Sequence, residues 1–249
     1  MRLQTALHGL FAGLLVACGP VGASGLQVVP IGLEFTPANP AEGLWLTNTG
    51  DRELRAQVRV FHWTQTGGKD ELAPTQTFLA SPPMLSLAPG GRQLVRVIRI
   101  GGPAASGTGE DAFRVLIDEL PQASQPQSSG LQYILRYSVP VFVGPANPPD
   151  EAAVGAALHW SSVHEGGQLM LQVRNDGARH AQISDVSLLP ASGDAIVVSP
   201  GLLGYALPGM VMRWPLKAPT DPVGAGMKLK ARINGKPVDQ AFAVGDLPR

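Results

Sequence analysis

The chain has 249 residues, which is enough for two domains of ordinary size. Basic and acidic residues number 19 each, so the formal net charge is zero and gives no electrostatic case for nucleic-acid binding. With 30 glycines, 23 prolines and only 15% charged residues, the composition favours many short strands over helices.

The first 23 residues have the pattern of an export signal. Arg2 precedes an apolar run from Leu10 to Ala17 that is too short to span a bilayer, and small residues follow up to Ala23. Cleavage after Ala23 is the favoured interpretation. The alternative is a lipoprotein, because the one cysteine, Cys18, follows a short sequence that resembles a bacterial lipoprotein cleavage box. A product cut after Ala23 has no cysteine and must rely on core burial for stability.

The first half contains apolar or alternating segments that are separated by turn residues. The expected strands cover 26–35, 43–48, 54–64, 78–87, 94–100, 113–120 and a last strand that starts at Leu131. Pro30 suits a sheet edge or a crossing point better than a central position. Ser81-Pro82-Pro83 is compatible with a cis peptide bond.

The last strand of this half is distinguished by its surroundings. The uncharged run 121–130 precedes it, and 144–149, the strongest linker signal in the chain, follows it. Its alternation places five side chains on one face, which are Leu131, Tyr133, Leu135, Tyr137 and Val139. A long edge strand beside a linker can lend such a face to another chain by strand addition. The pattern alone also fits a strand that fills its own core.

The second half repeats this pattern in kind, with expected strands at 157–160, 168–175, 183–189, 195–198, 211–216, 227–233 and 240–244. No segment after the leader has helical periodicity. The chain is therefore expected to be all-β, with two immunoglobulin-like β-sandwich domains in tandem that cover 24–144 and 145–249.

Three stretches, taken in order and at their spacing, resemble the periplasmic pilus assembly chaperones of the chaperone-usher pathway. They are Ser81-Pro82-Pro83 with Leu87-Ala88-Pro89-Gly90-Gly91 and Val95-Arg96-Val97, then FRVLIDELP from Phe113, then RYSVPVFV from Arg136. The last stretch looks most like the archaic, spore-coat-U-type branch. The resemblance covers essentially the whole chain after the leader.

The resemblance implies a non-enzymatic chaperone in the periplasm of a Gram-negative bacterium, with no nucleotide or cofactor. It would bind incomplete pilus subunits by donor-strand complementation, lending them Leu131, Tyr133 and Leu135 from the alternating face that Tyr137 and Val139 continue. It would then deliver them to an outer-membrane usher. An exposed apolar edge would also favour a self-capping dimer.

Two departures from the family pattern concern charged residues. The family's cationic anchor for the subunit's C-terminal carboxylate would fall at Gly32 and Pro140, neither of which is basic, so the anchor is absent or moved. The candidate substitutes are Arg136, Arg96 and Arg99. The family's interdomain ion pair is half present, with Glu119 in place and Gly144 at the position of its partner.

Other functional classes have little support in the sequence. The chain has no nucleophile elbow and no complete phosphate loop, and its histidines have no metal-ligand spacing, so neither an enzyme nor a zinc protein is expected. Two rivals remain, a surface-anchored β-sandwich binding module and a pilus structural subunit. Lipidation at Cys18 would favour the first of them.

Overall fold

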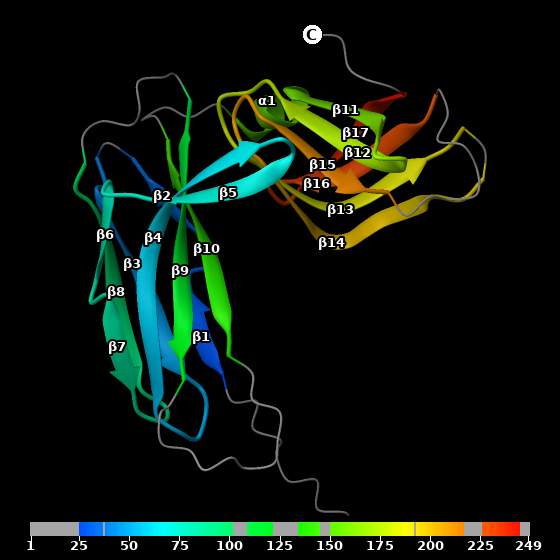
Figure 1. The fold of residues 1–249 in the computed structure, drawn as a ribbon. Coiled ribbons are helices and arrows are strands. Elements are labelled where there is room, and N and C mark those ends of the chain that lie inside the picture. Colours follow the sequence, from blue (N-terminus) through cyan, green and yellow to red (C-terminus); the bar gives the residue numbers. More distant parts are fainter. Residues whose placement is uncertain are drawn as a thin grey trace, which may run out of the picture.

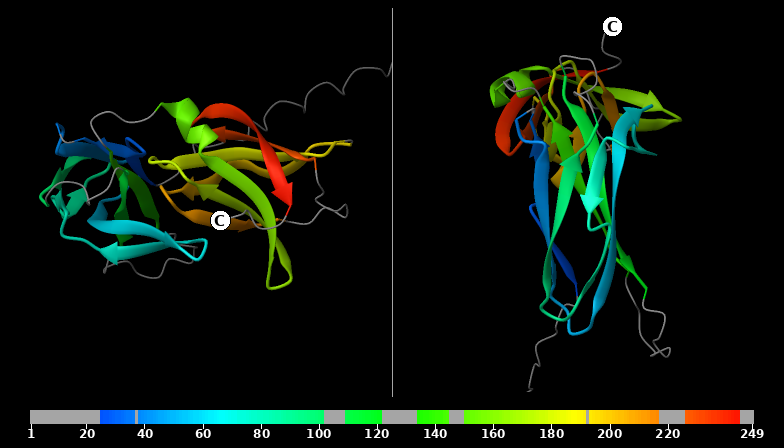
Figure 2. Two further views of the ribbon diagram at one scale, coloured as in Figure 1. Left: turned by 90° about the horizontal axis from the view of Figure 1, so that it is seen from above. Right: turned by 90° about the vertical axis from the view of Figure 1, so that its left-hand side faces the viewer.

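The computed structural model describes residues 25–36, 38–101, 109–121, 134–144, 150–191, 193–216 and 226–244. These residues form two β-rich domains that meet at an angle, each with its own buried apolar cluster (Figures 1 and 2). The prediction of an all-β chain with two sandwich domains in tandem is confirmed. None of the helices in these segments is long and apolar enough to cross a membrane. The predicted leader lies outside the described residues, as do 145–149 of the predicted linker and the expected donor residues Leu131 and Tyr133.

The first domain packs two sheets face to face. One sheet has the order β1 (Leu26–Val29), β3 (Ala41–Asn48), β8 (Arg92–Arg99) and β6 (Phe78–Ser81). The other has the order β2 (Leu33–Phe35), β10 (Arg136–Val143), β9 (Asp111–Leu120), β4 (Leu54–Thr66) and β5 (Lys69–Pro74), with β7 (Met84–Leu87) also paired to β4. The space between the sheets is filled by alternating residues that are fully buried, such as Leu44, Val97, Val115 and Val141.

The predicted first strand passes from one sheet to the other at Pro30. β1 pairs antiparallel with β3, whereas β2 pairs parallel with β10 in the facing sheet. The Val29-Pro30 peptide bond is cis, as is Ser81-Pro82. Because proline has no backbone N–H for a ladder, a crossing point is a position that tolerates it.

Two elements were not predicted. β5 is exposed along its whole length and has no alternation, so it gives no periodic signal; it pairs with β4 through a turn at Gly67 and Gly68, which have φ angles of 59° and 78°. The helix α1 (Glu151–Ala156) is too short to show periodicity. Asp150 caps it, since its carboxylate accepts a 2.7 Å hydrogen bond from the backbone N–H of Ala153.

The second domain also has two layers, which are joined by one shared strand. One layer contains β14 (Ile196–Ala206), β13 (Ala181–Leu189) and β16 (Lys228–Ile233), and the other contains β11 (Leu158–Glu165), β12 (Gln168–Asn175) and β15 (Val211–Pro215). β17 (Lys236–Val244) pairs antiparallel with β16 and then parallel with β11, so it passes from one layer to the other. The core of the second domain includes Trp160, Leu171, Ile183 and Leu229.

Candidate functional site

A buried joint holds the two domains together. Trp63 and Phe142 of the first domain form an apolar cluster with Tyr205 and Leu207 of the second. The side-chain amide of Gln65 donates a 2.9 Å hydrogen bond to the carbonyl of Tyr205 and accepts a 2.8 Å hydrogen bond from the N–H of Leu207. The second domain is therefore attached to the outer face of the sheet that contains β4, β9 and β10.

A carboxylate and an imidazole form a second contact across this joint. Oε2 of Glu110 lies 2.6 Å from Nδ1 of His180 and accepts a 2.8 Å hydrogen bond from its backbone N–H. The His180 ring stacks on Phe142 with ring centroids 3.4 Å apart. Glu119, the residue expected to serve an interdomain ion pair, lies at the other end of β9, opposite Ala56. Glu119 therefore does not lie at the joint, and the expectation that it serves an interdomain ion pair is wrong. β9 begins beside the joint at Asp111 and extends away from it.

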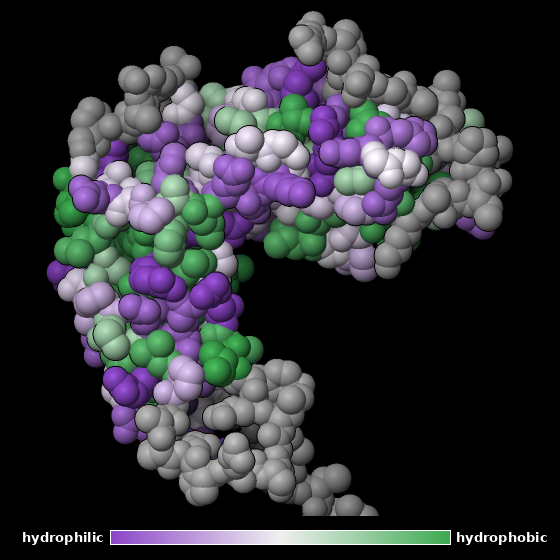
Figure 3. Space-filling model, in the orientation of Figure 1, coloured by the Kyte–Doolittle hydropathy of each residue, from purple (hydrophilic) through white to green (hydrophobic). Residues whose placement is uncertain are grey.

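The molecule is hollowed on the side where the first domain and the underside of the second face each other (Figure 3). The outer face of β4, β9 and β10 forms one wall of this concave side. One residue row below the joint, Phe61, Arg114 and Pro140 lie next to one another across these three strands.

Arg114 lies on β9 beside the joint, next to Trp63 and Tyr205. Its neighbours Phe113 and Val115 are buried in the core, so its side chain points to the outer face. Its Cζ lies 3.6 Å from the ring centroid of Trp63 and 5.1 Å from that of Tyr205. Burial lowers the pKa of Arg114, and the charge of Asp70 opposes this shift.

Within the described part of the chain, no hydrogen bond or ion pair occupies the Arg114 guanidinium. The aromatic rings hold its plane in position, which leaves its N–H donors available to a planar anion such as a carboxylate. The sequence pattern did not indicate Arg114, because its strand has the pattern of an ordinary core strand. The available signal was a single basic residue between two buried apolar ones.

The predicted substitutes for the cationic anchor lie elsewhere. Arg136 makes an ion pair with Asp118, which Arg59 also contacts at 2.6 Å. Burial alone would raise the pKa of Asp118, but hydrogen bonds from the two arginines hold it below its usual value. Arg96 and Arg99 lie on β8 in the opposite sheet, where Arg96 points outward between buried valines. Arg136 is therefore already paired with a carboxylate, and Arg96 and Arg99 do not lie on the sheet of Pro140.

The positions of the missing anchor are neighbours, as the resemblance requires. A Cβ atom added at Gly32 would lie 3.8 Å from Cγ of Pro140. Arg114 is the cross-strand partner of Pro140 on β9, so a basic group is present one strand away from the expected place.

Towards its N-terminal end, β10 extends beyond the core of the first domain. Val139 is buried, and Tyr137 lies at the rim with its hydroxyl donating to the carbonyl of Leu26, so neither is free for another chain. Burial, and then the charge of Glu119, raise the pKa of Tyr137. Leu135 has the same strand parity but lies beyond the rim and is 38% exposed. The alternating face therefore continues past the end of the sandwich.

The same end of β10 has an open backbone edge. On one side it pairs with β9 from Arg136 onward, and the carbonyl of Leu135 accepts a 3.0 Å hydrogen bond from the N–H of Glu119. On the other side, β10 pairs with β2 only from Val141 to Val143. Among the described residues no strand covers the edge from Arg136 to Val139, so backbone donors and acceptors remain there for an added strand.

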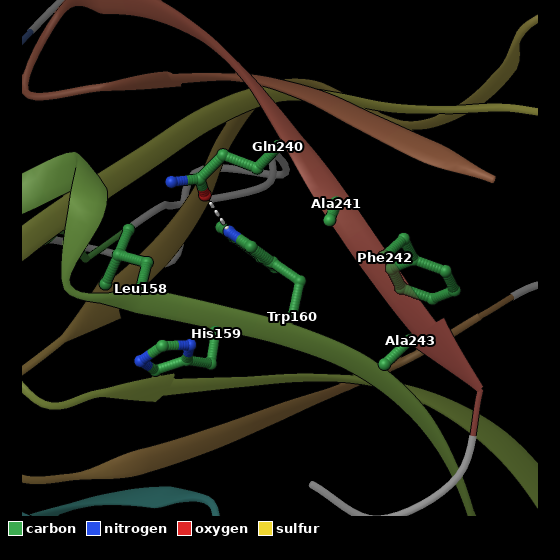
Figure 4. A pocket seen from close by; sticks show the side chains of 7 residues that line it. All are labelled: Leu158, His159, Trp160, Gln240, Ala241, Phe242 and Ala243. Atoms are coloured by element: carbon green, nitrogen blue, oxygen red, sulfur yellow. Dashed lines mark hydrogen bonds between the residues drawn. The ribbon is translucent and has the colours of Figure 1, made fainter. Parts of the chain in front are cut away.

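The described residues also form a pocket away from this site. This pocket of about 310 Å³ lies between β11 and β17 (Figure 4), lined by Leu158, His159, Trp160, Gln240, Ala241, Phe242 and Ala243. The Trp160 indole N–H donates to Oε1 of Gln240, and the amide N–H of Gln240 donates to the carbonyl of Gly155, so the polar groups of both side chains are already paired. In the described segments, no group of three or more His, Cys, Asp or Glu residues is arranged to hold a metal ion.

Comparison with known families decides the assignment. The model of the pili and flagellar-assembly chaperone family, PapD N-terminal domain, matches residues 25–149, half of the chain. The chain belongs to this family. A search of curated proteins gives no match.

Solved structures of such chaperones share the fold along nearly the whole chain. One is the CsuC-CsuE chaperone-tip adhesion subunit pre-assembly complex from archaic Csu pili of Acinetobacter baumannii, with 23% identity, a TM-score of 0.66 and coverage of 90% of this chain and 100% of the other. Another is the CupB2 chaperone of Pseudomonas aeruginosa, with 17% identity, a TM-score of 0.59 and coverage of 85% of this chain and 97% of the other. A third is the complex of the SafA pilin with the SafB chaperone of Salmonella enterica. It has 15% identity, a TM-score of 0.62 and coverage of 88% of this chain and 96% of the other.

Proposed function

We propose that this pilus chaperone holds an incomplete pilus subunit on its concave side and completes the subunit's sheet with the N-terminal end of β10. The open edge from Arg136 to Val139, which continues into the exposed Leu135, carries this proposal. The complexes of related chaperones with a tip adhesion subunit and with a pilin support it. Leu131, Tyr133 and Leu135 are the donated side chains, whereas Tyr137 and Val139 stay in the chaperone's own core.

The expected binding free energy is suited to holding a subunit and later releasing it. Each fully buried leucine or tyrosine contributes about 1.5–3 kcal/mol before ordering costs, and each added backbone hydrogen bond about 0.5–1.5 kcal/mol net. Three side chains and a few hydrogen bonds are enough to retain a subunit. They remain replaceable by a strand that fits the subunit better, so no nucleotide is required.

The subunit's C-terminal carboxylate is placed at Arg114 in this proposal. The guanidinium lies over the Trp63 ring and near the Tyr205 ring, and its donors have no partner in the described residues. Pro140, one of the two positions of the family's cationic anchor, is its cross-strand neighbour. A carboxylate there would accept a bidentate, charge-assisted pair of hydrogen bonds.

The remaining steps follow from the family. The chaperone acts in the periplasm of a Gram-negative bacterium after removal of residues 1–23, and delivers the subunit to an outer-membrane usher. The match to an archaic chaperone complex supports assignment to the archaic branch. In the free protein, two copies pairing through the open β10 edge would cap each other.

Co-expression with an incomplete pilus subunit tests the strand. A tag on the chaperone is used for purification, and native mass spectrometry counts the subunits bound. Leu135→Asp places a charge on the donated face and should abolish the complex. Leu79→Asp, at a leucine that is 48% exposed on the opposite sheet, is the matched control and should keep it. Equal subunit recovery with both variants contradicts the proposal.

The same assay tests Arg114. Arg114→Gln removes the charge but keeps a polar side chain of similar reach, and Arg114→Lys keeps the charge without the planar fork. We expect retention to fall in the order arginine, lysine, glutamine. Amidation of the subunit's terminal carboxylate should weaken retention by wild type strongly and retention by Arg114→Gln little further. If amidation weakens wild type and Arg114→Gln alike, Arg114 is not the anchor.

A further inference from the structure

We propose that β14 of the second domain provides a second contact for the bound subunit, through an apolar pair formed by Val197 and Leu202. This inference rests on the proposed function, since the occupant is the subunit already held on the first domain. It adds a role for the second domain beyond forming the joint.

The two side chains are on the same side of β14 only because the strand is irregular. They are five residues apart, and regular alternation would place them on opposite faces. The pairing of β14 with β13 shifts register three times, and Ser199, Pro200 and Gly201 lie between the two residues. As a result Val197 is 64% exposed and Leu202 is 58% exposed, while Ile196, Val198 and Leu203 pack on the core. Bulges of this kind redirect side chains.

The apolar pair is continuous with the site proposed on the first domain. β14 ends at the joint, where the Tyr205 ring lies 5.1 Å from Cζ of Arg114. From that point the strand runs outward along the underside of the second domain, which faces the hollow (Figures 1 and 3). A subunit whose C-terminus reaches Arg114 and whose sheet is extended by β10 would therefore lie against β14.

The chemistry of this surface specifies what it contacts. β14 pairs with a strand on one side only, so it is an edge of its sheet. Beside Val197 and Leu202, the outer face of β13 has Ser187 and Ser184, so a narrow apolar strip borders a polar one. Pro200 interrupts the edge and opposes continuous strand addition. The surface thus fits two apolar side chains of the subunit rather than an added strand.

The test compares release rates of the subunit from purified complexes. The double variant Val197→Ser/Leu202→Ser removes the apolar strip without adding charge, and Leu79→Ser is the matched control on the far sheet of the first domain. We expect the double variant to melt at the wild-type temperature, to capture the subunit, and to release it about tenfold faster. Hydrogen exchange should show slower exchange of β14 amides in the wild-type complex than in the free protein.

The outcomes separate the two proposals. Wild-type release from the double variant, with unchanged exchange in β14, overturns the role of β14 while Leu135→Asp still reports on the β10 site. If the wild-type chain captures no subunit at all, the proposed function fails and this inference fails with it. If the double variant melts early, the exchange comparison in the wild-type complex decides alone.

Discussion

Gln65 should be a main determinant of how firmly the two domains are joined. Its amide makes three hydrogen bonds, to the carbonyl of Tyr205, from the N–H of Leu207, and to the carboxylate of Asp70 at 2.9 Å. Gln65→Met retains most of the side-chain volume and removes all three. The two bonds to the second domain are worth about 0.5–1.5 kcal/mol each, and a buried N–H left without a partner costs about 1–3 kcal/mol more. We therefore expect a loss of about 2–6 kcal/mol in the docking of the domains.

Denaturant unfolding, followed by Trp fluorescence and by small-angle scattering, measures this loss. The wild-type joint should unfold together with the first domain, whereas in Gln65→Met the domains should separate earlier, with a larger radius of gyration. Gln93→Met is the control, because the exposed Gln93 bonds only to the carbonyl of its neighbour Leu94. If Gln65→Met stays within about 0.5 kcal/mol of wild type and scatters identically, the joint does not depend on this amide.

Two further changes test local features of the two domains. Because the folded-state pKa of Asp118 lies below its unfolded value, its ion pairs stabilise the protein fully above the unfolded pKa of about 3.9 and lose this effect as the pH falls through the folded value. Asp118→Asn should cost about 0.5–1 kcal/mol at pH 7 and weaken the acid-dependent drop in melting temperature; identical pH profiles would show that the ion pairs contribute nothing. In the second domain, a Cβ at Gly204, where φ is 157°, would lie 2.9 Å from Cζ2 of Trp214, so Gly204→Ala should cost about 1–3 kcal/mol. Gly201→Ala, where a Cβ meets nothing within 4 Å, should be nearly neutral, and thermal melts that rank the two equally would refute the clash.

Local alternation was enough to predict most of the strands. β12 has the predicted bounds, and the crossing at Pro30 follows from the chemistry of proline. β14 was predicted only over 195–198, because its bulges break the alternation on which that prediction depended. β5 was missed because an exposed hairpin arm has no buried face to mark it.

The site depends on contacts between distant segments, and these were less predictable. Strand parity grouped Leu135 with Tyr137 and Val139, but where the core ends along β10 depends on how far the facing strands reach. The joint uses Glu110 and His180, 70 residues apart, and no local pattern links them. Arg114 is recognisable only when Trp63 and Tyr205, from different domains, are seen beside it.

The placement of the subunit on β10 can be tested most directly by a photo-crosslinking amino acid at position 135 in the chaperone co-expressed with an incomplete pilus subunit. Mass spectrometry then identifies the linked peptides, with the same amino acid at position 79 as the reference. The account predicts links from position 135 to a strand that borders the gap in the subunit's sheet, and none from position 79. Links from position 79 with none from position 135 would contradict it.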